Sequence, residues 1–145
     1  MDFNPVEELN DLASIMKNIY PEVHIDTTLG STGKSIRLDR DDMLELIGNI
    51  LDNSCKYART TVSVRVDVDD EELSMIFEDD GAGLEPSQIE HISQRGVRLD
   101  ESRDGHGIGL GLCQDIVNSY QGEMEFSRAQ LGGLRVMIRI PYLLQ

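Results

Sequence analysis

The sequence contains little cysteine, little histidine and little positive charge. Its 145 residues include two cysteines, Cys55 and Cys113, and three scattered histidines, and these lack the spacing of a zinc site. Each cysteine lies in an apolar stretch with helical spacing. We therefore expect two reduced, buried thiols, as in a domain of the cytosol.

The sequence also lacks a long apolar run. No stretch approaches the ~20 consecutive apolar residues that a membrane-spanning helix requires. The N-terminus does not show the regions of a signal peptide. We therefore expect a soluble, cytoplasmic chain without direct membrane contact, although it could be one piece of a membrane protein.

Acidic residues outnumber basic ones, with 27 Asp and Glu against 13 Lys and Arg and a net charge of -14. Such a surface repels nucleic acids and anionic membranes, so both are excluded as partners. An acidic protein binds a polyphosphate only where backbone N–H groups and a few basic side chains override this field.

Length and composition predict a single globular domain over residues 1–145. Hydrophobic residues make up 39% and charged residues 28%, which is ordinary for a soluble protein with its own core. The sequence shows neither an internal repeat nor a low-complexity tract.

The pattern of apolar residues predicts a mixture of helices and strands. Caps and helical spacing predict helices over residues 4–20, 39–57 and 108–120, and helical turns over 87–92. Asn4 is the expected cap of the first helix, and either Asp39 or Asp41 that of the second. Alternation and turn residues predict strands over residues 23–27, 35–39, 61–69, 73–78, 122–129 and 134–140. Two hairpins favour an α/β sandwich over a doubly wound parallel sheet. Residues 93–106 show no clear period and are expected to form a mobile loop.

The first candidate site is a polar stripe on the second helix. At about 100° per residue, Asn49, Asn53 and Lys56 share one side, whereas the apolar side chains point the other way. Asparagine carbonyl oxygens suit Mg²⁺, which takes few protein ligands, and a lysine can neutralise a phosphate. A solvated helix face would show the same pattern, so the stripe alone does not identify a site.

The second candidate site is the run Asp-Asp-Gly-Ala-Gly from Asp79 to Gly83, at the end of a predicted strand. A carboxylate at a strand end can accept a hydrogen bond from an exocyclic amine such as that of adenine. Gly81 and Gly83 let the backbone come close to a flat ring. A simple turn would use the same residues.

The third candidate site is a ladder of alternating glycines, Gly105, Gly107, Gly109 and Gly111, before the last long helix. Backbone N–H groups at a helix start form an anion site. The spacing is neither that of the dinucleotide fingerprint nor that of the P-loop, so both folds are disfavoured. Four alternating glycines are a costly way to begin a helix, which favours a functional role. Arginines of the preceding loop could swing onto a terminal phosphate.

The order of these motifs resembles that of the GHKL superfamily and, within it, of the sensor histidine kinases. The resemblance is greatest to PhoQ-type kinases. The resemblance covers residues 39–141, and its N box is the run N-I-L-D-N-S-C-K-Y from Asn49 to Tyr57. It implies the Bergerat fold: α+β, a two-layer α/β sandwich with a mixed, mostly antiparallel sheet of about five strands packed on about three helices. It also implies a flexible ATP lid over residues 93–107. The helix within residues 1–20 would follow a missing dimerisation domain.

The resemblance implies ATP and Mg²⁺ as cofactors and a role for each motif. Asn49 and Asn53 would hold Mg²⁺, Tyr57 would line the adenine pocket, and Asp79 would bind the adenine amine. The catalytic residues would be Asn49, Lys56, Arg95 and Arg98. The other nucleotide-binding residues would be Gly81, Gly83, Gly105, His106, Gly107, Ile108, Gly109 and Leu110. The F box, residues 91–95, departs from the family because it lacks the usual phenylalanines.

Asn49 separates the activities found in this superfamily. The pattern also resembles that of gyrase-like, MutL-like and Hsp90-like ATPases, but those proteins have a glutamate at the position of Asn49. That glutamate activates the attacking water. An amide cannot act as a general base near neutral pH. The sequence therefore favours transfer of the γ-phosphoryl of ATP to a histidine, whose neutral imidazole has a nucleophilic lone pair. A GHKL ATPase and a nucleotide-sensing module without transfer chemistry are the alternatives.

The phosphoacceptor is expected outside this chain. None of His24, His91 and His106 stands in the helical His-Glu context of the family's acceptor. The implied partner is the dimerisation domain of the same protein, with a response regulator reached indirectly. The implied location is the cytoplasmic side of an inner-membrane sensor. The chain should bind ATP without labelling itself.

Overall fold

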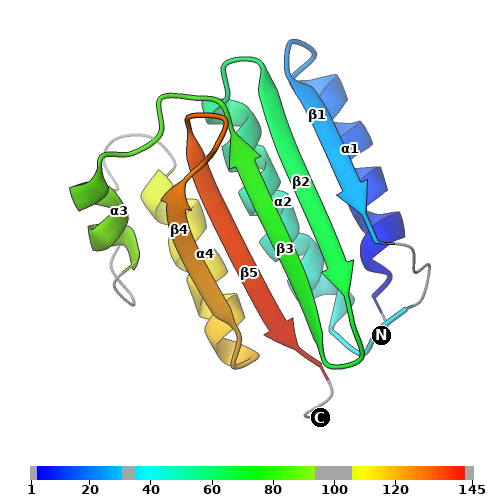
Figure 1. Ribbon diagram of the computed structural model, residues 1–145. Coiled ribbons are helices and arrows are strands. Elements are labelled where there is room, and N and C mark those ends of the chain that lie inside the picture. Colours follow the sequence, from blue (N-terminus) through cyan, green and yellow to red (C-terminus); the bar gives the residue numbers. More distant parts are fainter. Residues whose placement is uncertain (1–2, 31–34, 94–105, 143–145) are drawn as a thin grey trace.

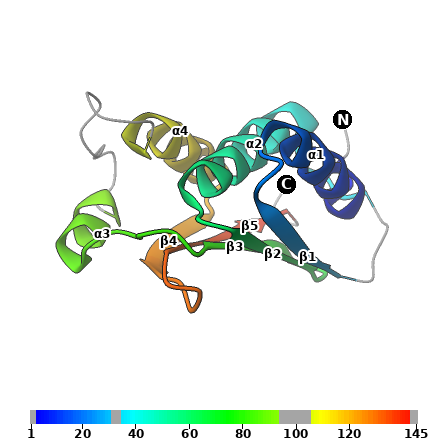
Figure 2. The same ribbon diagram turned by 90° about the horizontal axis from the view of Figure 1, so that it is seen from above.

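In the part of the chain that the structure describes, a five-stranded sheet carries helices on one face (Figures 1 and 2). The computed structural model describes residues 3–30, 35–93 and 106–142, with backbone alone at 90–93 and 106–109. The strands are β1 (His24–Leu29), β2 (Thr61–Val68), β3 (Glu72–Asp79), β4 (Glu123–Arg128) and β5 (Leu134–Pro141). The helices are α1 (Pro5–Ile19), α2 (Arg40–Tyr57), α3 (Pro86–Ser93) and α4 (His106–Ser119).

The sheet is mixed and mostly antiparallel. Its strand order is β1-β2-β3-β5-β4, in which β1 and β2 are parallel and all other neighbours are antiparallel. The connection between β1 and β2 contains α2, because parallel neighbours need a long crossover. Figure 2 shows α1, α2 and α4 above the sheet and α3 beyond the β4 edge. The expected two-layer sandwich is confirmed.

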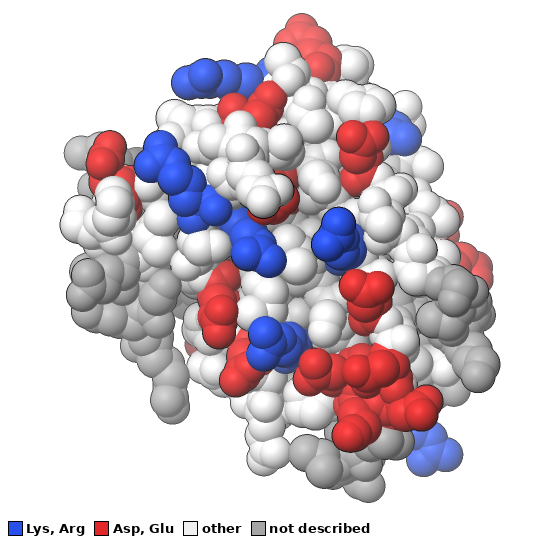
Figure 3. Space-filling view, in the orientation of Figure 1, with Lys and Arg blue, Asp and Glu red and all other residues white. Residues whose placement is uncertain are grey.

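Alternation along the strands decides which side chains the helices cover. In β2, Val62, Val64 and Val66 are buried, while Ser63 and Arg65 between them point to the other face. The hydrophobic core fills the space between the sheet and α1, α2 and α4. The opposite face of the sheet carries charges of both signs (Figure 3).

Side-chain caps begin the first two helices where the sequence predicts them. The Asn4 side chain accepts a hydrogen bond from the Glu7 N–H at 3.1 Å, with Pro5 in the first turn of α1. Asp39 accepts one from the Asp42 N–H at 2.9 Å and caps α2. Each cap satisfies an N–H group that the first helical turn leaves without a partner.

The predicted strand over residues 35–39 is wrong. Only an isolated bridge forms there, in which Phe3 and Ile36 exchange two backbone hydrogen bonds of 3.0 and 2.7 Å. Leu38 is already buried in the core, and Asp39 is occupied as the cap of α2. The segment is therefore too short to extend the sheet before the helix begins.

The predicted start of the last long helix is also wrong, because α4 begins at His106 rather than at residue 108. Gly107, Gly109 and Gly111 consequently lie within the helix. Each glycine costs about 1 kcal/mol relative to alanine in a helix interior. Burial of apolar side chains farther along α4 against the core offsets this cost, since each contributes about 1.5–3 kcal/mol.

Of the described helices, none has the combination of length and hydropathy needed to cross a membrane. Most of the segment expected to form the ATP lid, residues 94–105, lies outside the described residues.

The two cysteines are buried and unpaired, as expected. The Cys113 thiol lies 3.7 Å from the Leu46 carbonyl oxygen, to which it donates. Burial raises the pKa of Cys55 and of Cys113 to about 12 in each case, because an apolar environment disfavours the thiolate. Neither thiol is therefore a nucleophile in the folded chain.

We predict that both thiols resist alkylation by iodoacetamide at pH 8 in the native chain and react fully in urea. Thiolate is the reactive form, and both its formation and reagent access require unfolding. Mass spectrometry would count the modified cysteines. Rapid labelling of either cysteine in the native chain would contradict this burial.

Candidate nucleotide-binding site

The candidate site centres on Asp79, a carboxylate buried at the end of the central strand β3. Its side chain points to the helix-covered face of the sheet, and the residue is 4% exposed. Oδ1 accepts hydrogen bonds from the Gly81 N–H at 2.9 Å and from the Leu134 N–H at 3.4 Å. No donor from the described residues reaches Oδ2, which therefore remains available as an acceptor.

Two opposing effects set the pKa of Asp79. Burial and, to a smaller extent, the neighbouring charge of Asp80 raise it, and the hydrogen bonds from the Gly81 and Leu134 N–H groups lower it without cancelling the rise. The pKa thus lies above the ordinary value for aspartate. A buried carboxylate without a cationic partner is unfavourable for folding, and such groups occur mainly where function requires them.

Glycines allow the backbone to close around this carboxylate. A Cβ atom at Gly133 would lie 1.9 Å from Asp79 Oδ1, and one at Gly81 would lie 2.0 Å from the Tyr57 carbonyl oxygen. Gly83 has a φ of 71°, a left-handed conformation that favours glycine. The Gly133 N–H also donates to the Asp79 carbonyl oxygen at 3.0 Å. A side chain at Gly81 or Gly133 would therefore displace the site.

A hollow of about 70 Å³ adjoins Asp79. Its walls are Tyr57, Asp79, Ala82, Gly83 and Leu134. The sequence predicts three of these residues but not Ala82 or Leu134, which carry no polar signal. The place of Leu134 at the site could be inferred from the sequence only through the Gly132-Gly133 pair before it, because the turn at that pair brings β5 against Asp79.

The polar stripe on α2 is present, and Tyr57, the residue after Lys56, lines this hollow. Asn49 and Asn53 are half-buried, one turn apart, while Lys56 is exposed with its Nζ 5.5 Å from the centre of the Tyr57 ring. The apolar residues of α2 are buried on the other side, as predicted. Tyr57 thus brings the end of α2 against the run that begins at Asp79.

The third motif is described only in part. His106, Gly107, Ile108 and Gly109 form the first turn of α4, and Leu110 is 2% exposed within the core. Figure 2 shows α4 beside α2 on the same face of the sheet. Gly105, Arg95 and Arg98 lie outside the described residues.

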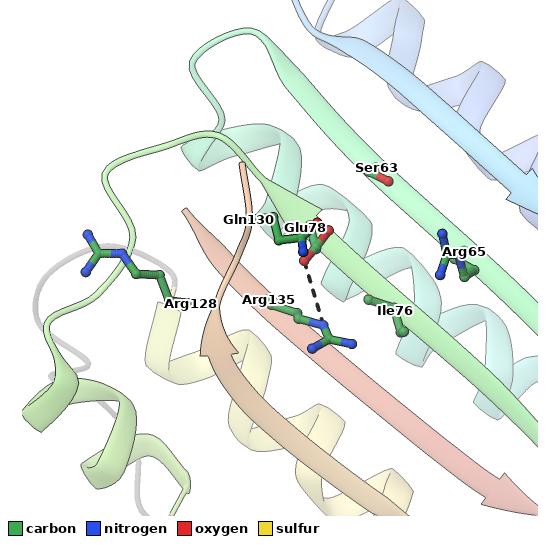
Figure 4. Close-up of a pocket in the computed structure, with 7 residues that line it drawn as sticks. All are labelled: Ser63, Arg65, Ile76, Glu78, Arg128, Gln130 and Arg135. Atoms are coloured by element: carbon green, nitrogen blue, oxygen red, sulfur yellow. Dashed lines mark ion pairs between the residues drawn. The ribbon is translucent and has the colours of Figure 1, made fainter. Parts of the chain in front are cut away.

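A larger hollow, of about 210 Å³, lies on the open face of the sheet (Figure 4). Arg135 faces Glu78 across β5 and β3, with the Nε–Oε2 distance at 3.7 Å, while Arg128 points away from this pair. Arg65 and Ser63 line the side formed by β2. The hollow is polar and open and contains none of the predicted site residues. We therefore place the candidate site at Asp79.

Comparison with known proteins identifies the family. The family model described as histidine kinase-, DNA gyrase B-, and HSP90-like ATPase matches residues 38–144. The chain belongs to this family. Its fold and its ATP-binding character, both expected from the motifs, are thereby confirmed.

Curated relatives of this family member are sensor kinases. The chain is 36% identical over 140 residues to the sensor protein kinase CarS of Pseudomonas aeruginosa, covering 96% of this chain and 31% of the relative. It is 34% identical over 139 residues to the sensor protein PhoQ of Escherichia coli K12, covering 94% and 29%. The chain thus spans less than a third of the length of these relatives.

Solved structures share the fold. A mycobacterial sensor histidine kinase, MprB, matches with a TM-score of 0.79 at 21% identity, covering 97% of this chain and 96% of that one. Full-length ShkA in complex with AMPPNP matches with a TM-score of 0.81 at 19% identity, covering 98% and 31%. At these identities the similarity establishes the architecture alone.

We predict that Asp79→Asn abolishes ATP binding without lowering stability at neutral pH. The amide oxygen keeps the bonds from Gly81 and Leu134, but the NH₂ group then points where an adenine amine would donate. Calorimetry would measure the affinity, and urea unfolding the stability.

The raised pKa of Asp79 sets the sign of the pH dependence. The folded chain prefers the protonated carboxyl, so the wild type should gain stability relative to Asp79→Asn as the pH falls through that pKa. If Asp79→Asn retained its affinity for ATP, Asp79 would not be part of the binding site.

We predict that Gly133→Ala weakens ATP binding by about tenfold or more, because the new methyl group must displace Asp79. Gly132→Ala is the control. Its Cβ would meet nothing within 4 Å, although its φ of 110° strains an alanine. Both variants should lose stability in urea, but only Gly133→Ala should lose affinity in calorimetry. Equal affinity losses would mean that the turn acts only through folding.

Proposed function

We propose that this chain is the catalytic ATP-binding domain of a two-component sensor histidine kinase. It would transfer the γ-phosphoryl group of ATP to a histidine on a separate dimerisation domain. The observation that carries the proposal is Asp79, a buried carboxylate that lines a hollow, with Oδ1 held by backbone N–H groups and Oδ2 without a donor from the described residues. The sensor-kinase names of the relatives support it.

The adenine base would occupy the hollow beside Asp79. Oδ2 would accept a hydrogen bond from the exocyclic amine, which guanine does not present at that position. Gly83 would permit close approach of the backbone to a flat ring, and Tyr57 and Leu134 supply apolar walls. Gly81 would act beside them by packing against the Tyr57 carbonyl oxygen. The pocket therefore suits adenine better than guanine.

The phosphates and Mg²⁺ would lie between α2 and the first turn of α4. The donor chemistry of Asn49 and Asn53 fits Mg²⁺, since both amides are half-buried, share one helix face and offer hard oxygen ligands. Bound Mg²⁺ would neutralise charge on the phosphates during transfer. Lys56 would supply a further positive charge, and the N–H groups of Gly107 to Leu110 would face the anion.

The proposed role of Asn49 excludes efficient hydrolysis. An asparagine cannot deprotonate water, so the site would position ATP and stabilise charge without activating a nucleophile. A neutral imidazole needs no such base. The proposed lid, residues 93–107, would add Arg95, Arg98 and Gly105 to the phosphate site. These three assignments remain predictions from the sequence.

The proposed domain arrangement treats residues 1–145 as one catalytic domain. Residues 1–20, which include α1, would follow the dimerisation domain that carries the acceptor histidine. That histidine would pass its phosphoryl group to a response regulator. The whole protein would be a membrane sensor with this domain on the cytoplasmic side.

A labelling experiment tests the transfer. The chain is incubated with Mg²⁺ and ATP labelled at the γ-phosphate, alone and with the dimerisation domain of its own protein. We predict acid-labile label on the dimerisation domain only, and none when Asn53→Ala removes a Mg²⁺ ligand. Steady release of phosphate by the chain alone would instead indicate a gyrase-like ATPase. ATP binding without a labelled histidine would indicate a sensing module.

A further inference from the structure

Asp80, the neighbour of Asp79, is saturated with hydrogen bonds from a single turn. Its Oδ1 accepts from the N–H groups of Arg59, Thr60 and Thr61 at 2.8, 2.9 and 3.1 Å. Its Oδ2 accepts from the Thr60 hydroxyl at 2.5 Å. The Asp80 N–H donates to the Thr61 carbonyl oxygen at 3.2 Å, so backbone and side chain hold the same segment.

The turn that Asp80 holds begins one residue after Ala58, the C-cap of α2, and leads into β2. Tyr57, the last residue of α2, is one wall of the candidate hollow, and Asp79 is another. Asp80 therefore links the chain segments that carry these two walls. The lack of room for a Cβ at Gly81 against the Tyr57 carbonyl oxygen shows how tightly the segments meet.

The charge of Asp80 is stable near neutral pH. Burial alone would raise its pKa, but the hydrogen bonds from Thr60, Thr61 and Arg59 outweigh burial and place the pKa well below the usual range. The carboxylate thus stays ionised, and its hydrogen bonds are charge-assisted and short. Both oxygens are occupied, which leaves little capacity for a ligand.

We propose that Asp80 is a positioning residue that sets the distance between Tyr57 and Asp79 and so shapes the pocket for adenine. It acts through the 59–61 turn and does not touch the nucleotide. This inference rests on the proposed function. The inference adds one requirement to that function. Hydrogen bonds must hold the loop after β3 against the segment that follows α2 before Asp79 can recognise the base.

The chain contains a matched control at the other end of the β2–β3 pair. Asp69 Oδ1 accepts from the Glu71 and Glu72 N–H groups at 2.7 and 2.8 Å. These bonds lower the pKa of Asp69, as the turn bonds do for Asp80. Asp69→Ala therefore removes a carboxylate that holds a turn of the same hairpin, far from the candidate site.

The experiment compares Asp80→Ala, Asp80→Asn and Asp69→Ala with the wild type. Calorimetry measures the affinity for ATP and for GTP, and urea unfolding measures stability. A purely structural loss reduces the folded fraction and affects both nucleotides equally, whereas a misplaced Asp79 reduces the preference for ATP. The ratio of the two affinities thus separates positioning from folding.

We expect Asp80→Ala to weaken ATP binding about tenfold and to reduce the ATP preference over GTP. Asp80→Asn keeps an oxygen for the three N–H groups, and its NH₂ can donate to the Thr60 hydroxyl, so it should restore most of the affinity. Asp69→Ala should lose stability but keep wild-type affinity for ATP.

Two outcomes would overturn the inference. Unchanged nucleotide selectivity in a folded Asp80→Ala variant would reduce Asp80 to a structural role, as would equal affinity losses in Asp69→Ala and Asp80→Ala. Failure of the wild type to bind ATP would instead reject the proposed function. If Asp80→Ala does not fold, Thr60→Val, which removes the hydroxyl donor to Asp80 Oδ2, decides the question in the same assay. A reduced preference for ATP over GTP supports the inference, and wild-type preference rejects it.

Discussion

One carboxylate holds the site together, and the fold around it depends on its hydrogen bonds to the backbone. Asp79 Oδ1 accepts from the N–H groups of Gly81 and Leu134, which belong to the loop after β3 and to the start of β5. The same aspartate receives the Gly133 N–H at its carbonyl oxygen. Two backbone segments, the loop after β3 and the Gly133–Leu134 entry to β5, are thus tied to one residue, and the hollow beside it lies where they converge.

This arrangement has a cost in stability that the rest of the domain offsets. Burial raises the pKa of Asp79, so the ionised form disfavours folding. Gly81 and Gly133 add the large conformational entropy of glycine in the unfolded chain. The core between the sheet and α1, α2 and α4 supplies the compensating burial. Sites that sacrifice stability for recognition commonly lie on such a rigid layer.

The sequence predicts those features that depend on local chemistry. The caps Asn4 and Asp39, the alternation in β2 and the polar stripe of α2 all follow from short-range patterns. The start of α4 does not, since burial against α2 outweighs the low helix propensity of its glycines. The role of Asp80 is equally hidden, because its partners lie about 20 positions earlier in the chain and have no side-chain signal except the Thr60 hydroxyl. Long-range backbone hydrogen bonds leave no periodicity in a sequence.

Adjacent residues of β3 show why the size of a hollow does not identify the site. Glu78 and Asp79 follow each other, but the pleat sends Glu78 to the open face and Asp79 to the helix side. Glu78 meets Arg135 in the larger hollow, where solvent and an opposite charge satisfy it. Asp79 has neither a cation nor free access to water, and one of its oxygens lacks a donor in the described chain. A ligand that donates a hydrogen bond therefore finds an acceptor without a described protein donor at Asp79 on the inner face, whereas Glu78 on the open face already lies beside Arg135.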